Sequence, residues 1–190
     1  MDTCFAKLER CAEAGRLADD ASLTELLALL QDPEWRVRYA AAVALGDRRD
    51  ARAVAPLVAC LAAEDAAPLF TQKTDIGSSP AGYPFDFKAE FPPDLTPETR
   101  ACWERRGRVK QAASLALGAI GKTAPEILAH LHRYVTDPSH DPEVRAAAAK
   151  ALGLIGDPTS RPHIEKATQD FEWCTRTEAQ TALRRIAART

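Results

Sequence analysis

The chain has 190 residues, and its 25 Lys and Arg side chains nearly balance 27 Asp and Glu side chains, for a net charge of −2. Alanine supplies 37 residues, whereas Phe and Tyr supply only 6 and 3. This composition disfavours a β-sandwich or barrel and favours closely packed helices. The near-neutral charge argues against a dedicated nucleic-acid binder, so we do not expect nucleic acid as a partner.

The apolar pattern predicts one N-terminal helix, over about residues 3–14, followed by a repeated pair of helices. The first helices of the pairs are expected at about 23–30, 54–61, 127–135 and 164–168. Each second helix carries apolar residues at i, i+3, i+4, i+7 and i+8, which share one helical face. This motif starts at Val37, Val109 and Val144, with a degenerate copy at Thr175.

Capping signals set the expected helix boundaries. Ser22 with Glu25 and Thr123 with Glu126 fit capping boxes. Asp32, Thr96 and Asp141 each precede a proline at an expected first helical position. Gly121 and Gly156 stand where helices are expected to end.

The second helical pair is interrupted by a long segment over about residues 66–97. It holds six of the 13 prolines and more than half of the Phe and Tyr residues, namely Phe70, Tyr83, Phe85, Phe87 and Phe91. Apolar and charged residues alternate strictly over 85–91, which predicts a short strand. Three interpretations stay open: the aromatics cover an edge of the helical stack, the segment is an arm that docks on another protein or on a second copy of the chain, or it is disordered.

The helix after this segment is expected over 97–120 if Gly107 does not interrupt it. Its first turns would then carry Trp103, Arg105 and Arg106, a mixture that is enriched at binding hot spots. The alternative is that Trp103 packs under the inserted segment.

Two further residue series recur at equivalent repeat positions. A basic residue follows the first motif position each time, at Arg38, Lys110, Arg145 and Arg176. We expect these side chains to bind turn carbonyls or the preceding aspartate. Trp35 and Trp173 are equivalent as well, and we expect them to pack between helical pairs.

The sequence gives little support for a catalytic or metal site, and no cofactor is expected. His130 and His132 are two residues apart and so point in different directions on a helix. A phosphate-binding loop, a G-x-S-x-G elbow and an HExxH motif are all missing from the sequence. Five cysteines without a CxxC pair predict free thiols in the cytoplasm. The sequence offers neither a secretory signal nor a stretch apolar enough to span a membrane.

The segments 32–46 and 141–156, each opening with Asp-Pro-Glu and ending in glycine, resemble HEAT-like repeats of the phycobilisome-lyase type. The resemblance implies an all-α fold: a short right-handed α-solenoid of about four helical hairpins, forming one domain over 1–190 that the insertion at about 66–97 interrupts. Relatives of this type include protein-binding scaffolds, bilin lyase subunits, DNA-repair glycosylases and a di-iron hydroxylase with repeated His-Glu dipeptides. This sequence has no His-Glu dipeptide.

We therefore expect a non-catalytic scaffold or assembly factor that binds a protein partner. The alternative, which rests on the resemblance alone, is a phycobilin lyase or isomerase subunit that binds an open-chain tetrapyrrole and its acceptor protein. The second helices should line the concave face with Tyr39, Val43, Gln111, Ser114, Ala146, Lys150, Thr177 and Gln180. The candidate partner-binding residues are Tyr83, Phe85, Phe87, Phe91, Trp103, Arg105, Arg106, Tyr39, Gln111 and Lys150. A homodimer through the inserted arm is a further expectation.

Overall fold

The computed structural model describes residues 3–66 and 107–189, which belong to one compact unit. Its helices are α1 (Cys4–Arg16), α2 (Asp20–Leu29), α3 (Trp35–Arg48), α4 (Val54–Ala66), α6 (Arg108–Ile120), α7 (Pro125–Thr136), α8 (Pro142–Ile155), α9 (Arg161–Ala167) and α10 (Trp173–Ala187). Two short 3₁₀ helices, Ala51–Ala53 and Pro158–Ser160, precede α4 and α9. The predicted strand and the candidate residues Tyr83, Phe85, Phe87, Phe91, Trp103, Arg105 and Arg106 lie outside the described residues.

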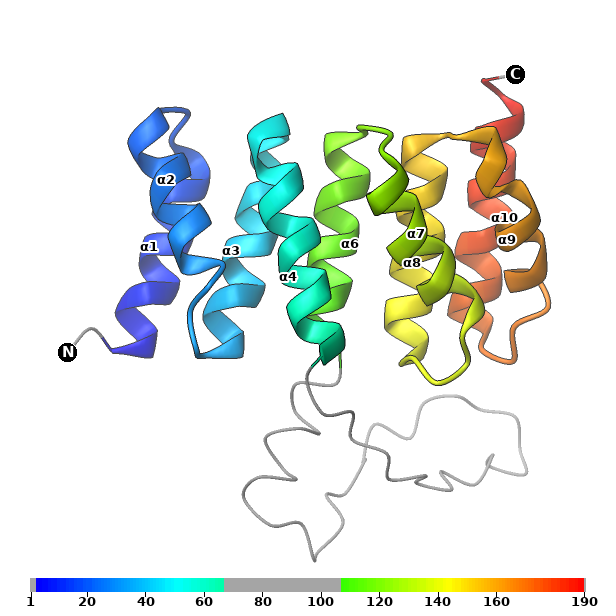
Figure 1. Ribbon diagram of the computed structural model, residues 1–190, viewed down its shortest axis with the longest axis horizontal. Helices are drawn as coiled ribbons and strands as arrows, with labels where there is room; N and C mark the ends of the chain where they lie inside the picture. Colours follow the sequence, from blue (N-terminus) through cyan, green and yellow to red (C-terminus); the bar gives the residue numbers. More distant parts are fainter. Residues whose placement is uncertain (1–2, 67–106, 190) are drawn as a thin grey trace, which may run out of the picture. The chain divides into compact units, whose positions relative to one another are not determined.

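The helices form two layers (Figure 1). The first helices of the hairpins, α2, α4, α7 and α9, lie in front in this view, and we call them the first-helix layer. Behind them lie α1, α3, α6, α8 and α10, the second-helix layer, in which each helix packs against the next. The predicted all-α solenoid is confirmed, and its four hairpins follow one N-terminal helix as expected.

Gly107 sets the start of α6. Its φ of 71° lies in the left-handed region, and it occupies the N-cap position of a helix that begins at Arg108. A helix that runs unbroken from 97 to 120 is therefore wrong, because a left-handed residue cannot continue a right-handed helix.

The observed helix caps agree in part with those predicted from the sequence. Asp141 caps α8 by accepting a hydrogen bond from the Glu143 N–H, and Gly121 and Gly156 end α6 and α8, as predicted. The two capping boxes are wrong. Asp19, not Ser22, caps α2, and α7 begins after Ala124 without a side-chain cap. Asp32 accepts from the Glu34 N–H as an N-cap would, but α3 itself begins at Trp35.

Glycine brings the helices of the second-helix layer into backbone contact. A Cβ built on Gly46 of α3 would lie 3.0 Å from Ala116 Cα of α6. The same construction on Gly118 of α6 gives 2.6 Å to Ala151 Cα of α8, and on Gly153 of α8 it gives 2.6 Å to Ala182 Cα of α10. Real Cβ atoms essentially never lie closer than 3.0 Å to such an atom, so Gly118 and Gly153 leave no room for a Cβ and Gly46 is at the limit. The repeated glycine is therefore the residue that lets successive helices approach.

The apolar residues of the repeat motif form the core between the two layers. Val37, Leu45, Leu117 and Leu152 are fully buried there with leucines of the first-helix layer. Cys4, Cys11 and Cys174 are free thiols. Burial raises the pKa of Cys11 to about 11, so this thiol is inert at neutral pH. Among the helices of the described part of the chain, none combines the length and the apolar character needed to cross a membrane.

Candidate functional site: a groove on the second-helix layer

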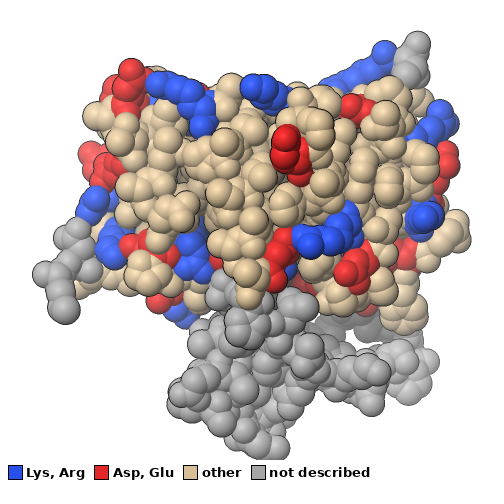
Figure 2. Space-filling model, viewed as in Figure 1, with Lys and Arg blue, Asp and Glu red and all other residues tan. Residues whose placement is uncertain are grey.

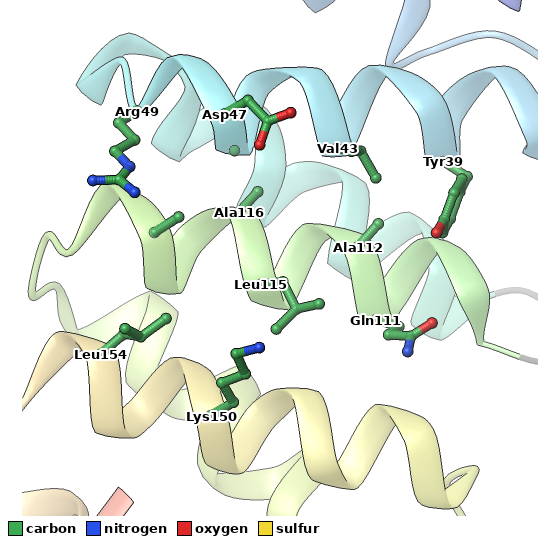
Figure 3. Close-up of a pocket in the computed structure, with 12 residues that line it drawn as sticks. Tyr39, Val43, Asp47, Arg49, Gln111, Ala112, Leu115, Ala116, Lys150 and Leu154 are labelled. Atoms are coloured by element: carbon green, nitrogen blue, oxygen red, sulfur yellow. The ribbon is translucent and has the colours of Figure 1, made fainter. Parts of the chain in front are cut away.

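A groove of about 350 Å³ lies on the exposed side of the second-helix layer, over α3, α6 and α8 (Figure 3). Its floor consists of small residues, Gly46, Ala112 and Ala116. The rest of its lining is Tyr39, Val43, Asp47, Arg49, Gln111, Leu115, Ala119, Lys150 and Leu154. The groove is thus apolar in its floor and polar at its ends, which is the usual character of a binding site.

The repeat places these residues in rows across the three helices. Tyr39 and Gln111 occupy one repeat position. Val43, Leu115 and Lys150 occupy the position four residues later, and Asp47, Ala119 and Leu154 the next. Because four residues are about one helical turn, the rows line the same side of their helices. The residues between the rows have small side chains or none, so they do not fill the groove.

Three of the predicted site residues meet in this groove. Tyr39, Gln111 and Lys150 all line it, and Tyr39 and Val43 are 36% and 41% exposed although they are large and apolar. Ser114 was expected on the same surface, and this is wrong. It is fully buried because it is equivalent to Ala42 and Ala149, which face the core, while the groove position of α6 belongs to Leu115.

The sequence did not predict Asp47, Leu115, Ala119, Leu154 or Arg49 as groove residues, and Arg49 is the one with an unusual backbone conformation. It ends α3 with a φ of 55°, the one left-handed residue other than glycine in the described chain. The equivalent helix ends use Gly121 and Gly156. The signal was present in the sequence, since Arg49, Gly121 and Gly156 each lie three residues after the repeated glycine.

The basic series has the structural role expected of it. Arg38 donates to the Asp32 and Pro33 carbonyls and pairs with Glu64 at 2.7 Å. Arg176 donates to the carbonyls of Asp170 and Phe171. The carboxylates that pair with these basic residues are not the predicted ones. They come from a neighbouring element and not from the aspartate that precedes the helix. The pairs are Arg38–Glu64, Lys110–Asp65 and Arg145–Asp170, and Lys7–Asp32 adds a similar link from α1.

A cluster of polar side chains surrounds Asp65, near the end of α4. Lys110 Nζ lies 2.8 Å from Asp65 Oδ1, and the Tyr134 hydroxyl donates to both carboxylate oxygens at 2.9 Å. Arg133 pairs with the same carboxylate, and His130 Nδ1 lies 3.2 Å from it. Lys110 and Tyr134 are only 4% and 0% exposed. The cluster joins α4 to α6 and α7, so it fixes the helices on either side of residues 67–106.

We expect the unfolding free energy to fall in acid because of the buried carboxylates. Burial raises the pKa of Asp170, but the hydrogen bonds from Arg145 and the Glu172 N–H outweigh it, so the net pKa lies below the ordinary 3.8. Burial also raises the pKa values of Asp65 and Asp32, but hydrogen bonds from Lys110 and Lys7 outweigh it, so both pKa values lie below 3.8. A carboxylate with a lowered folded-state pKa stabilises the fold above its unfolded pKa.

Urea unfolding at several pH values should show this stabilisation intact above about pH 5 and lost progressively below it. The variant Asp170→Asn should show a smaller loss between neutral pH and pH 3, and an equal loss would contradict this account.

The histidines lie at the contact between α7 and α9 and beside the Asp65 cluster. His132 stacks on His163 with 3.9 Å between ring centroids, and its Nε2 lies 2.9 Å from the Ser160 hydroxyl. Burial, followed by the neighbouring His163, lowers the pKa of His132. Residues 3–66 and 107–189 contain no group of three or more His, Cys, Asp or Glu side chains arranged to hold a metal ion.

Charge on the face of the first-helix layer is mixed (Figure 2). Positive and negative side chains alternate along its upper and lower edges, and uncharged side chains cover much of the middle. The part of this face that belongs to described residues therefore offers no broad basic surface.

Stacked hairpins with one repeated helix motif define an α-solenoid of helical repeats. The model of the HEAT repeats matches residues 7–69 and 97–184, and the chain belongs to this family. A comparison with the curated proteins gives no match. Among solved structures, human deoxyhypusine hydroxylase in complex with glycerol is similar, with 17% identity and a TM-score of 0.40 over 98% of this chain and 81% of that one.

Proposed function

We propose that this HEAT-repeat protein is a non-catalytic scaffold that binds a protein partner in the groove of the second-helix layer. The observation that carries the proposal is the groove itself: three successive repeats present an open hollow with a small-residue floor and exposed Tyr39 and Val43. Large apolar side chains that stay exposed around a hollow are typical of interaction sites. We place the scaffold in the cytoplasm, because the five cysteines form no CxxC pair and no regular disulfide framework in the sequence.

Filling the groove tests this function. Ala119→Phe puts a large neutral side chain into the groove, whereas Ala129→Phe puts the same side chain on the exposed surface of α7. Affinity capture from cell extract should recover partners with the intact protein and with Ala129→Phe, and lose them with Ala119→Phe. Circular dichroism checks that both variants fold. Identical capture by all three proteins would exclude the groove as the binding site.

We also propose, from the sequence alone, that the inserted segment adds a second contact surface through Tyr83, Phe85, Phe87, Phe91, Trp103, Arg105 and Arg106. The support is the concentration of Phe and Tyr in this one segment of the chain. Deletion of residues 68–95 should remove part of the captured set or, if the segment joins two copies, halve the mass measured by light scattering. Unchanged partners and unchanged mass would show that the segment does not contribute to binding.

No observation on the described residues favours the tetrapyrrole alternative, and it rests on resemblance alone.

A further inference from the structure

The charged residues of the groove differ from the buried basic residues that link the helices. The basic residues that link helices, such as Arg38, Lys110 and Arg145, pair with carboxylates of neighbouring elements. Arg49 and Lys150 both line the groove, and neither forms an ion pair with any described residue. Asp47 is the single carboxylate of the groove lining and is likewise without an ion pair in that part of the chain. The groove lining therefore carries two positive charges and one negative charge, a net charge of +1.

Arg49 is held in place at a cost to the backbone. A left-handed backbone conformation costs a residue with a side chain about 1 kcal/mol relative to glycine. The equivalent ends of α6 and α8 use Gly121 and Gly156, whereas α3 uses Arg49. The end of α3 does not need this charge, because Arg48 already binds the Ala14 and Asp19 carbonyls there. Strain that persists at one residue of a hollow points to a use for its side chain.

Apolar residues lie beside the two cations. Figure 3 shows Arg49 at one end of the groove and Lys150 reaching from α8 toward Leu115, with Leu154 on the same helix. An occupant that matches this surface needs carboxylates for the cations and an apolar side chain for the two leucines. Acidic side chains would gain charge-assisted hydrogen bonds from Arg49 and Lys150.

We propose that the groove recognises an acidic segment of a partner protein, whose carboxylates bind Arg49 and Lys150 while a neighbouring apolar side chain covers Leu115 and Leu154. This inference rests on the proposed scaffold function and adds the chemistry of the partner. Asp47 repels such a segment and so excludes those with a carboxylate at its own position.

Selection of peptides from a random display library on the intact protein tests the inference. Peptides that bind the protein but not Ala119→Phe should be enriched in Asp and Glu next to Leu, Ile, Met or Phe. For a labelled peptide of this group, fluorescence anisotropy should give about tenfold weaker binding to Arg49→Ala/Lys150→Ala. Asp47→Asn should strengthen binding about twofold, an effect that general loosening of the fold cannot produce. The matched control is Lys122→Ala/Lys166→Ala, which removes two exposed cations outside the groove and should leave binding unchanged.

The outcomes separate the two proposals. Peptides that depend on the open groove but are neutral or basic would overturn the acidic partner and leave the scaffold function in place. Acidic peptides whose binding is equally weakened by the control pair would also overturn it, because nonspecific charge would then explain them. A selection without any peptide sensitive to Ala119→Phe would contradict the groove as a binding site and hence both proposals.

Discussion

Replacing Gly118 or Gly153 by alanine should lower the free energy of unfolding by about 2–3 kcal/mol, measured by urea denaturation. Each substitution puts a methyl group 2.6 Å from a backbone Cα atom of the next helix, Ala151 or Ala182. The backbone of a packed helix cannot move aside as a flexible side chain can, so α6, α8 and α10 must separate. Helix propensity alone predicts the opposite sign, because alanine favours a helix by about 1 kcal/mol over glycine.

Gly46 supplies the internal comparison for this prediction. Its constructed Cβ lies 3.0 Å from Ala116 Cα, so Gly46→Ala demands a smaller shift and should cost less than the other two substitutions. A thermal or urea series in which all three alanine variants are more stable than the parent protein would show that the helices are not in backbone contact.

Removal of the Asp65 carboxylate should destabilise the protein by about 3 kcal/mol in the variant Asp65→Ala. The substitution leaves the buried Lys110 ammonium without its carboxylate and the buried Tyr134 hydroxyl without its acceptor. An uncompensated buried charge is costly, whereas an apolar side chain in its place is tolerated. The double variant Asp65→Ala/Lys110→Met should therefore be more stable than Asp65→Ala alone.

The control for this effect is an exposed ion pair. Arg161 and Glu165 lie 3.0 Å apart with side chains 59% and 54% exposed, so Glu165→Ala should change the unfolding free energy by less than about 1 kcal/mol. If Asp65→Ala costs no more than Glu165→Ala, the Asp65 cluster does not hold α4, α6 and α7 together.

The periodic parts of the fold were predictable, and the parts set by three-dimensional contact were not. The i, i+3, i+4 pattern fixed the second helices because a buried face needs it. It also identified Tyr39, Gln111 and Lys150 as a shared surface. Ser114 was placed on that surface wrongly, because its repeat position matches that of the buried Ala42 and Ala149.

Local signals for helix boundaries competed with one another. Ser22 fits a capping box, but Asp19 lies three residues earlier and binds both the N–H and the hydroxyl of Ser22. Gly46, Gly118 and Gly153 each follow the first motif position by nine residues, yet their contacts with Ala116, Ala151 and Ala182 depend on how the hairpins stack. The ion pairs likewise join elements about 25 residues or more apart, which no local pattern specifies.

The glycine–alanine contacts have a consequence for the rate at which a partner binds. Gly46, Ala112 and Ala116 form the groove floor, and none of them has a side-chain rotamer to change. Their helices are held at backbone contact distance, so the hollow exists before the partner arrives and little conformational entropy is lost on the scaffold side. Association should therefore proceed as a single kinetic phase whose rate rises linearly with partner concentration, and any ordering cost falls on the incoming segment.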